Sequence, residues 1–285
     1  MNPYQHLVSE YARFAREGKS YPLGKFPPPP HPELAPDAPK VLIFSPHPDD
    51  ECIIGGLALR LLRDARMNVI NVAVTQGSKK ERQAERFHEL QDACRYLGFG
   101  LMPVGQSGLD KVTLESREGD KATWARSVES IVKILTDTGP RIIFVPHERD
   151  WHDTHIGTHF LVLDALARLP ADFECYVVET EFWGAMDDPN LMAESSVGDV
   201  TDLVTAVSFH IGEVRRNPYH LLLPAWLQDN VRRGGELVGG QGGAAPDFIF
   251  ATLYRLRKWS RGRLIEVLEG GTQLSSDSRP GDLFK

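Results

Sequence analysis

Apolar residues along this chain fall into blocks with two different spacings. Short, almost continuous apolar runs predict buried strands, and stripes of apolar residues every three or four positions predict helices packed against them. The predicted strands are residues 41–45, 69–75, 99–104, 141–146 and 174–183, and the predicted helices are 53–66, 80–97, 122–138 and 154–168. Strands and helices that alternate in this way predict an α/β fold, a Rossmann-like and mostly parallel sheet with helices on both faces.

The two ends of the chain follow other patterns. Residues 3–18 have apolar positions at helical spacing, and the proline-rich stretch after them predicts an extended arm that lies over the main domain. Beyond residue 200 the pattern predicts further helices, at 200–215 and 224–237, that close a substrate pocket. The predicted organisation is an N-terminal helix and arm (1–39), an α/β catalytic core (40–200), C-terminal pocket elements (201–269) and a poorly ordered polar tail (270–285).

Composition narrows the class of protein. The formal net charge of the 285 residues is -7 with no dense basic stripe, which argues against nucleic acid as a partner. No apolar run approaches the roughly 18 residues of a membrane span, and the first residues lack the pattern of a secretory signal. Cys52, Cys94 and Cys175 have no metal-ligand spacing, so we expect buried thiols in a reducing cytoplasm. A small-molecule ligand and a possible homo-oligomer fit this composition.

An unusual polar run follows the first predicted strand directly. Residues 45–51 read SPHPDDE, with three consecutive acids beside a histidine and two prolines that stiffen the turn. Clustered acids in an apolar neighbourhood repel one another unless a cation offsets their charge. His47 and Asp50 are three residues apart at a strand-to-helix turn, so both can converge on one ion, while Asp49 stays close to that ion without binding it. Ligands of open parallel sheets bind at this carboxyl edge.

A second cluster, residues 147–155, follows the predicted strand at 141–146 and reads HERDWHDTH. His152 and His155 lie three residues apart near a predicted helix start, so they share one face. Three protein ligands from His and Asp with one open position form a catalytic zinc arrangement. A free carboxylate beside such an ion serves as general base, and a nearby histidine can stabilise the oxyanion or protonate the departing amine. We therefore expect a Zn2+ hydrolase site, although Fe2+, Co2+ or Ni2+ could bind the same donors.

The two clusters together resemble the PIG-L/LmbE family of deacetylases. The resemblance rests on the HPDDE string after a strand and on Asp150, His152 and His155 further along. It continues in the TQG at 75–77, in the helix that contains Arg86 and Glu89 and ends at Leu97-Gly98, and in the Gly-Leu-Asp at 108–110. The resemblance covers roughly residues 40–170. It implies a zinc-dependent N-deacetylase that acts on an N-acetylglucosamine-type small glycoconjugate.

The resemblance also implies a role for each matching residue. It implies the metal ligands His47, Asp50 and His155, the general base Asp49, and His152 as partner of the charged transition state. Arg86 and Asp110 match family positions that contact the sugar or the leaving acetate. One departure concerns the family's H-P-D-H, because this chain has Asp153-Thr154 between the two histidines. The orientation of His155 therefore depends on different neighbours here.

Several residues have more than one interpretation. His147 or His159 could replace His155 as third ligand. Asp150 is interpreted as a hydrogen-bonding anchor that raises the basicity of His152, and Glu51 as a structural acid. Arg86 could lie on a solvated helix face and Asp110 in a plain turn.

The C-terminal third leaves its own alternatives open. Tyr219, His220 and Trp226 are candidates for an aromatic pocket wall, or ordinary packing residues. His210 lies where the family often has a histidine followed by S-Q, but this chain has Gly212-Glu213, so that position is not carried over.

Three rival functions remain beside N-deacetylation. An amidase acting on a larger acyl or thiol conjugate would use the same metal site with a wider pocket. A nucleotide-binding module is disfavoured because no glycine-rich phosphate loop follows the first strand. A non-catalytic, metal-stabilised carbohydrate-binding protein is disfavoured by the intact Asp49 beside the ligands.

Overall fold

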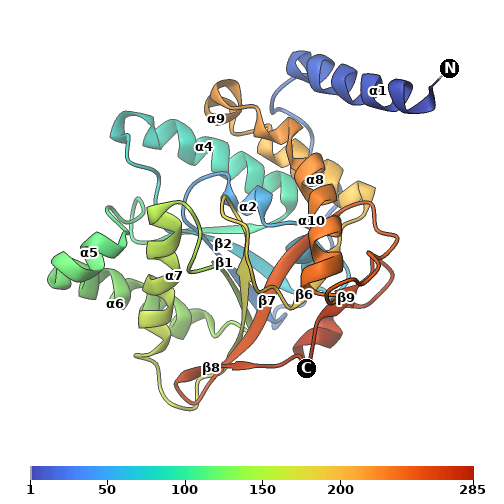
Figure 1. The fold of residues 1–285 in the computed structure, drawn as a ribbon. Coiled ribbons are helices and arrows are strands. Elements are labelled where there is room, and N and C mark those ends of the chain that lie inside the picture. The colour runs from blue at the N-terminus through green and yellow to red at the C-terminus, as the bar shows by residue number, and fades with distance from the viewer. Residues whose placement is uncertain (1) are drawn as a thin grey trace.

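A computed structural model describes residues 2–285 and places nine strands in one mixed sheet (Figure 1). The strand order is β3-β2-β1-β4-β5-β7-β6-β9, with β8 paired to β7. The parallel half consists of β1 (Lys40–Ser45), β2 (Asn68–Ala73), β3 (Gly100–Pro103), β4 (Ile142–Pro146) and β5 (Cys175–Thr180). Because β1 pairs in parallel with both β2 and β4, the chain reverses its winding direction there. The predicted α/β class and mostly parallel sheet are confirmed.

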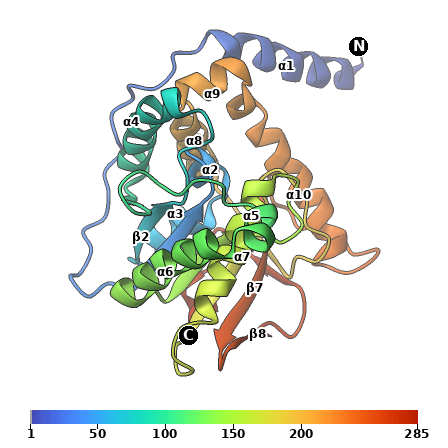
Figure 2. The same cartoon turned by 90° about the vertical axis from the view of Figure 1, so that its left-hand side faces the viewer.

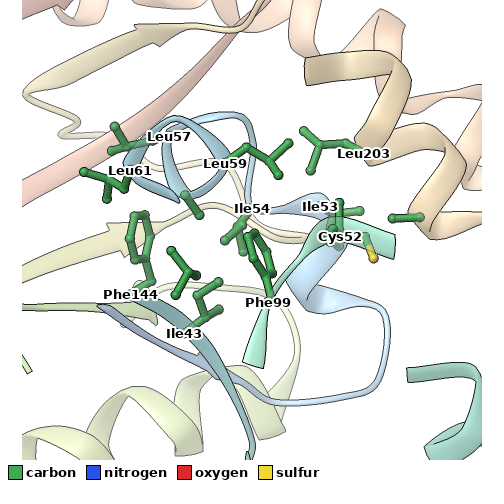
Figure 3. Close-up of a cluster of buried hydrophobic side chains, with 14 of the residues drawn as sticks. Ile43, Cys52, Ile53, Ile54, Leu57, Leu59, Leu61, Phe99, Phe144 and Leu203 are labelled. Carbon is green, nitrogen blue, oxygen red and sulfur yellow. The ribbon is translucent and has the colours of Figure 1, made fainter. Parts of the chain in front are cut away.

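Helices cover both faces of this sheet. One face carries α2 (Asp50–Ile53), α3 (Leu57–Arg63), α4 (Lys80–Leu97) and α8 (Val197–Val207), and the other α6 (Lys121–Thr138) and α7 (Asp153–Leu166), with the short α5 (Leu114–Gly119) beside them. Figure 3 shows the first core, where Ile43 and Phe144 of neighbouring strands meet Leu57 and Leu61 of α3. All four side chains are at most 1% exposed, so burial fixes the helices against the strands that carry the polar turns.

The helix predicted over 53–66 is broken in two at Gly55. Its φ is +84°, and a Cβ there would lie 1.9 Å from Oγ1 of Thr252, so only glycine fits this close approach. The hydroxyl of Tyr254 also donates a hydrogen bond to the carbonyl of Ile54 at 2.5 Å. The break therefore comes from packing against β7, a strand distant in sequence.

The sheet continues well beyond residue 200, where the sequence predicted only pocket elements. The antiparallel β7 (Ala251–Ser260) lies between β5 and β6 (Leu191–Glu194), and β8 (Arg263–Glu266) pairs with β7. The tail predicted as poorly ordered contains β9 (Thr272–Leu274), which pairs with β6. It ends in a short 3-10 helix, Pro280–Phe284, whose Phe284 is fully buried. The strands β7, β8 and β9, all beyond residue 200, thus belong to the same sheet as β1 to β5.

Two further helices follow α8, and the second of them packs against β6 and β7. These are α9 (Ile211–Arg216) and α10 (Leu223–Leu237), joined by a 3-10 turn at Tyr219–Leu221. The N-terminal α1 (Pro3–Glu17) lies at the outer edge of the molecule near α9 and α10 (Figures 1 and 2), followed by a 3-10 turn at Gly18–Ser20. The arm after it contacts the end of α4, where His31 Nε2 lies 3.1 Å from the carbonyl of Arg95. Among the described residues, no helix is both long and apolar enough to cross a bilayer.

Candidate metal centre and substrate pocket

The two polar clusters meet because β1 and β4 are neighbours. Each cluster begins where its strand ends, β1 at Ser45 and β4 at Pro146. Parallel strands bring their carboxyl ends to one edge of the sheet, and the first turns of α2 and α7 begin there. His155, in the first turn of α7, therefore lies next to the turn that contains His47.

Three donor atoms at this edge form a nearly regular triangle. Nδ1 of His47 lies 3.1 Å from Nε2 of His155, and Oδ2 of Asp50 lies 3.6 Å and 3.4 Å from these nitrogens. A tetrahedral ion with metal–ligand distances of about 2.0–2.2 Å would separate its ligands by about 3.3–3.6 Å. Oδ1 of Asp50 is buried and has no hydrogen-bond partner, an arrangement that favours a cation nearby. The residues present therefore fit a divalent metal ion.

His152 lies beside this triangle and is more exposed. One ring nitrogen from each of His47, His152 and His155 lies within 4.8 Å of the other two. Nδ1 of His152 accepts the backbone N–H of Thr154 at 3.2 Å. The proton of the neutral imidazole then resides on Nε2, which makes that atom the donor of the ring. Burial, followed by the neighbouring histidines, lowers the pKa of His152.

Asp150 contacts a different imidazole from the one that the sequence suggested. Its Oδ1 lies 3.5 Å from Nδ1 of His155, and it accepts no hydrogen bond from the ring of His152. Asp150 accepts instead the backbone N–H of His152 at 2.9 Å, and Oδ2 accepts those of Trp183 and Gly184. Burial would raise the pKa of Asp150, but His155 and the backbone donors hold it at about 2. A carboxylate behind a metal-facing histidine orients that ring.

The two alternative third ligands are engaged elsewhere. Nε2 of His147 lies 2.9 Å from the carbonyl of Gly184, and Nδ1 of His159 lies 2.8 Å from the carbonyl of Pro146. Burial lowers the pKa of His159 to about 4, so it is a neutral ring inside the core. Neither side chain belongs to the triangle formed by His47, Asp50 and His155.

Asp49 lies next to the triangle and faces the pocket. Its backbone has φ of +115°, a conformation that costs a non-glycine residue energy and that clusters at functional sites. The hydroxyl of Tyr219 donates to Oδ2 of Asp49 at 2.5 Å, and Nη2 of Arg86 lies 4.0 Å from the same oxygen. Burial, and then the charge of Asp50, raises the pKa of Asp49 to about 7.

A buried ion pair supports the turn from behind. Oε1 of Glu51 accepts from Nε2 of His210 at 2.8 Å, and Oε2 accepts the backbone N–H of Asp49 at 3.0 Å. Glu51 and His210 are both 0% exposed. Burial would lower the pKa of His210, but Glu51 outweighs it and raises that pKa. Cys52 donates to the same Glu51 oxygen, so these three side chains satisfy one another.

The pocket in front of the triangle has a volume of about 710 Å³, within the usual range for small-molecule sites. His47, Asp49, His152, Arg86, Asp110 and Tyr219 line it, together with Trp183, Glu213 and several basic side chains that the sequence did not single out. His220 and Trp226 do not line it: His220 is buried and Trp226 packs against the core. No local sequence pattern predicted that Glu213 or Trp183 would line the pocket, because contacts between segments distant in sequence place them there.

Like Tyr219, the expected substrate contacts Arg86 and Asp110 have protein partners. Arg86 donates to the carbonyl of Pro48 at 3.0 Å and is mostly buried rather than on a solvated helix face. Asp110 lies at the rim, with Oδ2 3.5 Å from Nζ of Lys80. One side of the pocket thus contacts the HPDDE turn through Arg86, and the other side includes Asp110 of the loop before α5.

Part of the chain matches a known protein family. Residues 42–166 match the model of the family described as PIG-L, GlcNAc-PI de-N-acetylase, which confirms the resemblance seen in the sequence. A probable N-acetyl-alpha-D-glucosaminyl L-malate deacetylase 2 of Bacillus cereus is 28% identical over 144 residues, 46% of this chain. The chain spans 63% of that relative, less than two thirds of its length.

Solved structures share the fold at lower identity. The N,N'-diacetylchitobiose deacetylase of Pyrococcus horikoshii superposes with a TM-score of 0.55 at 19% identity and covers 90% of this chain and 93% of its own. The 4-carboxy-2-hydroxymuconate hydratase of Pseudomonas putida KT2440 has a TM-score of 0.54 at 14% identity, covering 81% of this chain and 99% of its own. Since a deacetylase and a hydratase share it, the fold alone does not decide the reaction.

Proposed function

We propose, from the premise that residues 42–166 are a PIG-L-type domain, that this chain is a metal-dependent hydrolase. It removes the N-acetyl group from a small N-acetylglucosamine-type conjugate. The observation that carries the proposal is Asp49, a buried carboxylate that faces the pocket beside a His-Asp-His triangle without belonging to it. That arrangement supports a general base beside a metal ion.

His47, Asp50 and His155 would hold the ion. The His2Asp set favours zinc, and Fe2+, Co2+ or Ni2+ accept the same donors. A divalent metal bound there supplies Lewis-acid polarisation of the amide carbonyl and of the attacking water.

The protein's own groups then move the protons. Asp49 takes a proton from the water as its oxygen attacks the acetyl carbon, and Tyr219 holds that carboxylate in place. His152 donates from Nε2 to the oxygen that becomes negative. The proton held by Asp49 passes to the nitrogen as the C–N bond breaks, which releases acetate and a free amine.

The test is an assay of amine release. Metal-loaded and chelated protein are compared on N-acetylglucosamine, its disaccharide and a set of its glycosides, and one longer-chain N-acyl analogue of each glycoside is included. We expect release from acetylated glycosides that disappears with chelator and returns with added metal. Faster turnover of the longer acyl analogues would favour the amidase alternative, and binding of sugars without any turnover would favour a carbohydrate-binding protein.

A further inference from the structure

We propose that the N-terminal helix α1 binds a second copy of this chain and so forms a two-fold symmetric dimer. The apolar face of α1 in each copy packs into a groove beside α10 of the other copy. Both surfaces lie outside residues 42–166, the part of the chain that matches the family model. The inference concerns assembly and is independent of the proposed reaction.

Helix α1 exposes a large apolar face. Its apolar side chains recur every three or four residues, so they share one side of the helix. No residue of α1 is buried. A helix with one apolar side normally buries that side, and large exposed apolar patches mark interaction surfaces. The five large side chains of this face are all more than half exposed: Tyr4 (73%), Leu7 (53%), Val8 (67%), Tyr11 (52%) and Phe14 (56%).

The contacts of α1 with its own chain leave this face open. Figure 1 shows the helix extending away from the body toward its N-terminal end. The hydroxyl of Tyr11 donates a hydrogen bond to Oε1 of Gln228 on α10 at 2.7 Å. Gly18, directly after the helix, packs against Leu221, because a Cβ there would lie 2.7 Å from the Cδ2 of that leucine. These contacts place α1 beside α10 without covering its apolar side.

A groove with a volume of about 620 Å³ lies between α10 and the loop that follows it. We call it the α10 groove and define it by Gln228, Val231, Phe248 and Ile249. Ile249 is 59% exposed, so part of the apolar lining is open to solvent. Gln228 is also the residue that Tyr11 contacts, which makes the apolar face and the groove adjacent parts of one surface. In a two-fold symmetric pair, the helix of each copy meets the groove of the other, so the same contact forms twice.

The charge of this surface fits self-association. The sequences of α1 and α10 each contain two acidic and two basic residues, so neither helix has a net charge, although the chain has a net charge of -7. On α1, Arg13 pairs with both Glu10 and Glu17. Two copies therefore approach at this surface with little repulsion between like charges. A helix that binds a membrane surface is instead rich in Lys and Arg on its polar side.

The exposed area shows that the groove is needed. A stable interface buries about 800 Å² on each partner. An aromatic side chain can bury about 150–250 Å², so Tyr4, Tyr11 and Phe14, each exposed by one half to three quarters, offer roughly 300–450 Å² together. Leu7 and Val8 are smaller and add less than these three. Pairing of α1 with α1 alone is therefore too small, and the α10 groove supplies the remaining area.

The mass of the full-length protein in solution tests the inference. Light scattering after size exclusion, over a wide range of protein concentration, compares the wild type with Leu7→Glu/Phe14→Glu on the helix and with Ile249→Glu in the groove. The control Ser9→Glu/Arg16→Gln makes the same change in charge as the helix variant, but on the polar side of α1. The wild type and the control should have at least twice the monomer mass of 31.9 kDa.

The helix variant and the groove variant should each halve the mass of the wild-type assembly. We expect the dimer Kd to rise at least about a hundredfold, because symmetry counts each substitution twice. The substituted apolar side chains are all more than half exposed, so the fold should be kept, which circular dichroism checks. Leu7→Gln/Phe14→Gln adds no charge and serves as a second version of the helix variant.

Several outcomes would overturn the inference. These are a wild type that is monomeric at every concentration, an assembly that either the helix variant or the groove variant leaves intact, and an equal loss of mass in the control. Sedimentation of the wild type with phosphatidylglycerol vesicles is measured in parallel. A monomeric wild type that binds these vesicles, with binding lost in Leu7→Glu/Phe14→Glu, would show that lipid covers the apolar face instead of a second copy.

Discussion

Asp49 is held by contacts to both its backbone and its side chain. Its N–H is bound by Glu51 and its carboxylate by Tyr219, while its backbone keeps an unfavourable φ. None of these contacts involves a donor atom of the triangle, so the side chain can be changed without dismantling the candidate metal site.

The variant Asp49→Asn tests the role of this carboxylate. The amide has the same shape and can still accept from Tyr219, but it cannot take a proton from water. We expect metal content to stay stoichiometric and kcat to fall by about two to four orders of magnitude. Metal analysis and amine release are measured on one preparation. Loss of the ion would mean that Asp49 is a ligand and that its role is exchanged with that of Asp50.

Alanine variants of four histidines near the site should differ in metal content. His155→Ala removes one corner of the triangle and should abolish stoichiometric metal. His152→Ala should retain the ion and mainly lower kcat, because its ring faces the pocket. His147→Ala and His159→Ala serve as controls that keep the ion. Full occupancy in His155→Ala, with loss in one of the controls, would identify a different third ligand.

Asp150→Asn distinguishes the contact seen in the structure from the one suggested by the sequence. The carboxylate lies behind His155, so its loss should weaken metal affinity by about ten- to a hundredfold, the usual effect of such a partner. Competition with a chromogenic chelator measures this affinity. Unchanged affinity with a reduced kcat would instead place the effect of Asp150 on His152.

At the scale of elements, the start of α9 supports the HPDDE turn through the pair of His210 and Glu51. Removing one partner of a buried ion pair leaves an uncompensated charge, so His210→Ala should lower the free energy of unfolding by about 3–5 kcal/mol. It should also lower kcat more than it changes KM, because Glu51 positions the backbone of Asp49. Urea titration and steady-state kinetics measure the two effects. His210→Gln keeps a donor and should restore part of both; equal kinetics in wild type and His210→Ala would exclude this positioning.

The parallel half of the fold could be predicted from the sequence because its strands are continuous apolar runs. β7 was missed because its Arg255, Arg257 and Lys258 resemble a solvated basic segment, yet in the sheet Arg257 pairs with Glu179 and Lys258 with Glu174. The helix break at Gly55 was missed for a related reason, because it results from packing against β7. Contacts between segments far apart in sequence leave no local periodicity.

The residues of the candidate site also divide into those that local sequence patterns predicted and those that depend on contacts distant in sequence. His47, Asp49, Asp50, His152 and His155 lie in two short strings whose spacing could be interpreted directly. The supporting contacts from His210 and Tyr219, and the wall formed by Glu213, depend on how α9 folds over the sheet edge. The sequence marked Tyr219 only as a general aromatic candidate.

For the whole molecule, the metal ion should act as a cross-link between two neighbouring strands. His47 and Asp50 follow β1, whereas His155 belongs to α7 after β4. An ion that binds only the folded state stabilises it by about 3 kcal/mol at a hundredfold excess over Kd, which raises Tm by roughly 5–10 °C. Differential scanning fluorimetry with and without Zn2+ measures the shift. The same rise in His155→Ala would show that the ion binds elsewhere.

We expect the contacts around the HPDDE turn to determine when activity arises during synthesis. Three contacts of this turn join residues that are far apart in sequence. The separation is 170 residues between Asp49 and Tyr219 and 159 residues between Glu51 and His210. It is 200 residues between Ile54 and Tyr254. Domains begin to fold from the N-terminus while the ribosome still extends the chain. A nascent chain that has reached α7 therefore contains every proposed metal ligand, but it contains neither Tyr219, which contacts Asp49, nor His210, which pairs with Glu51. We expect metal capture to precede catalytic competence, with amine release beginning only after β7 has emerged and joined the sheet.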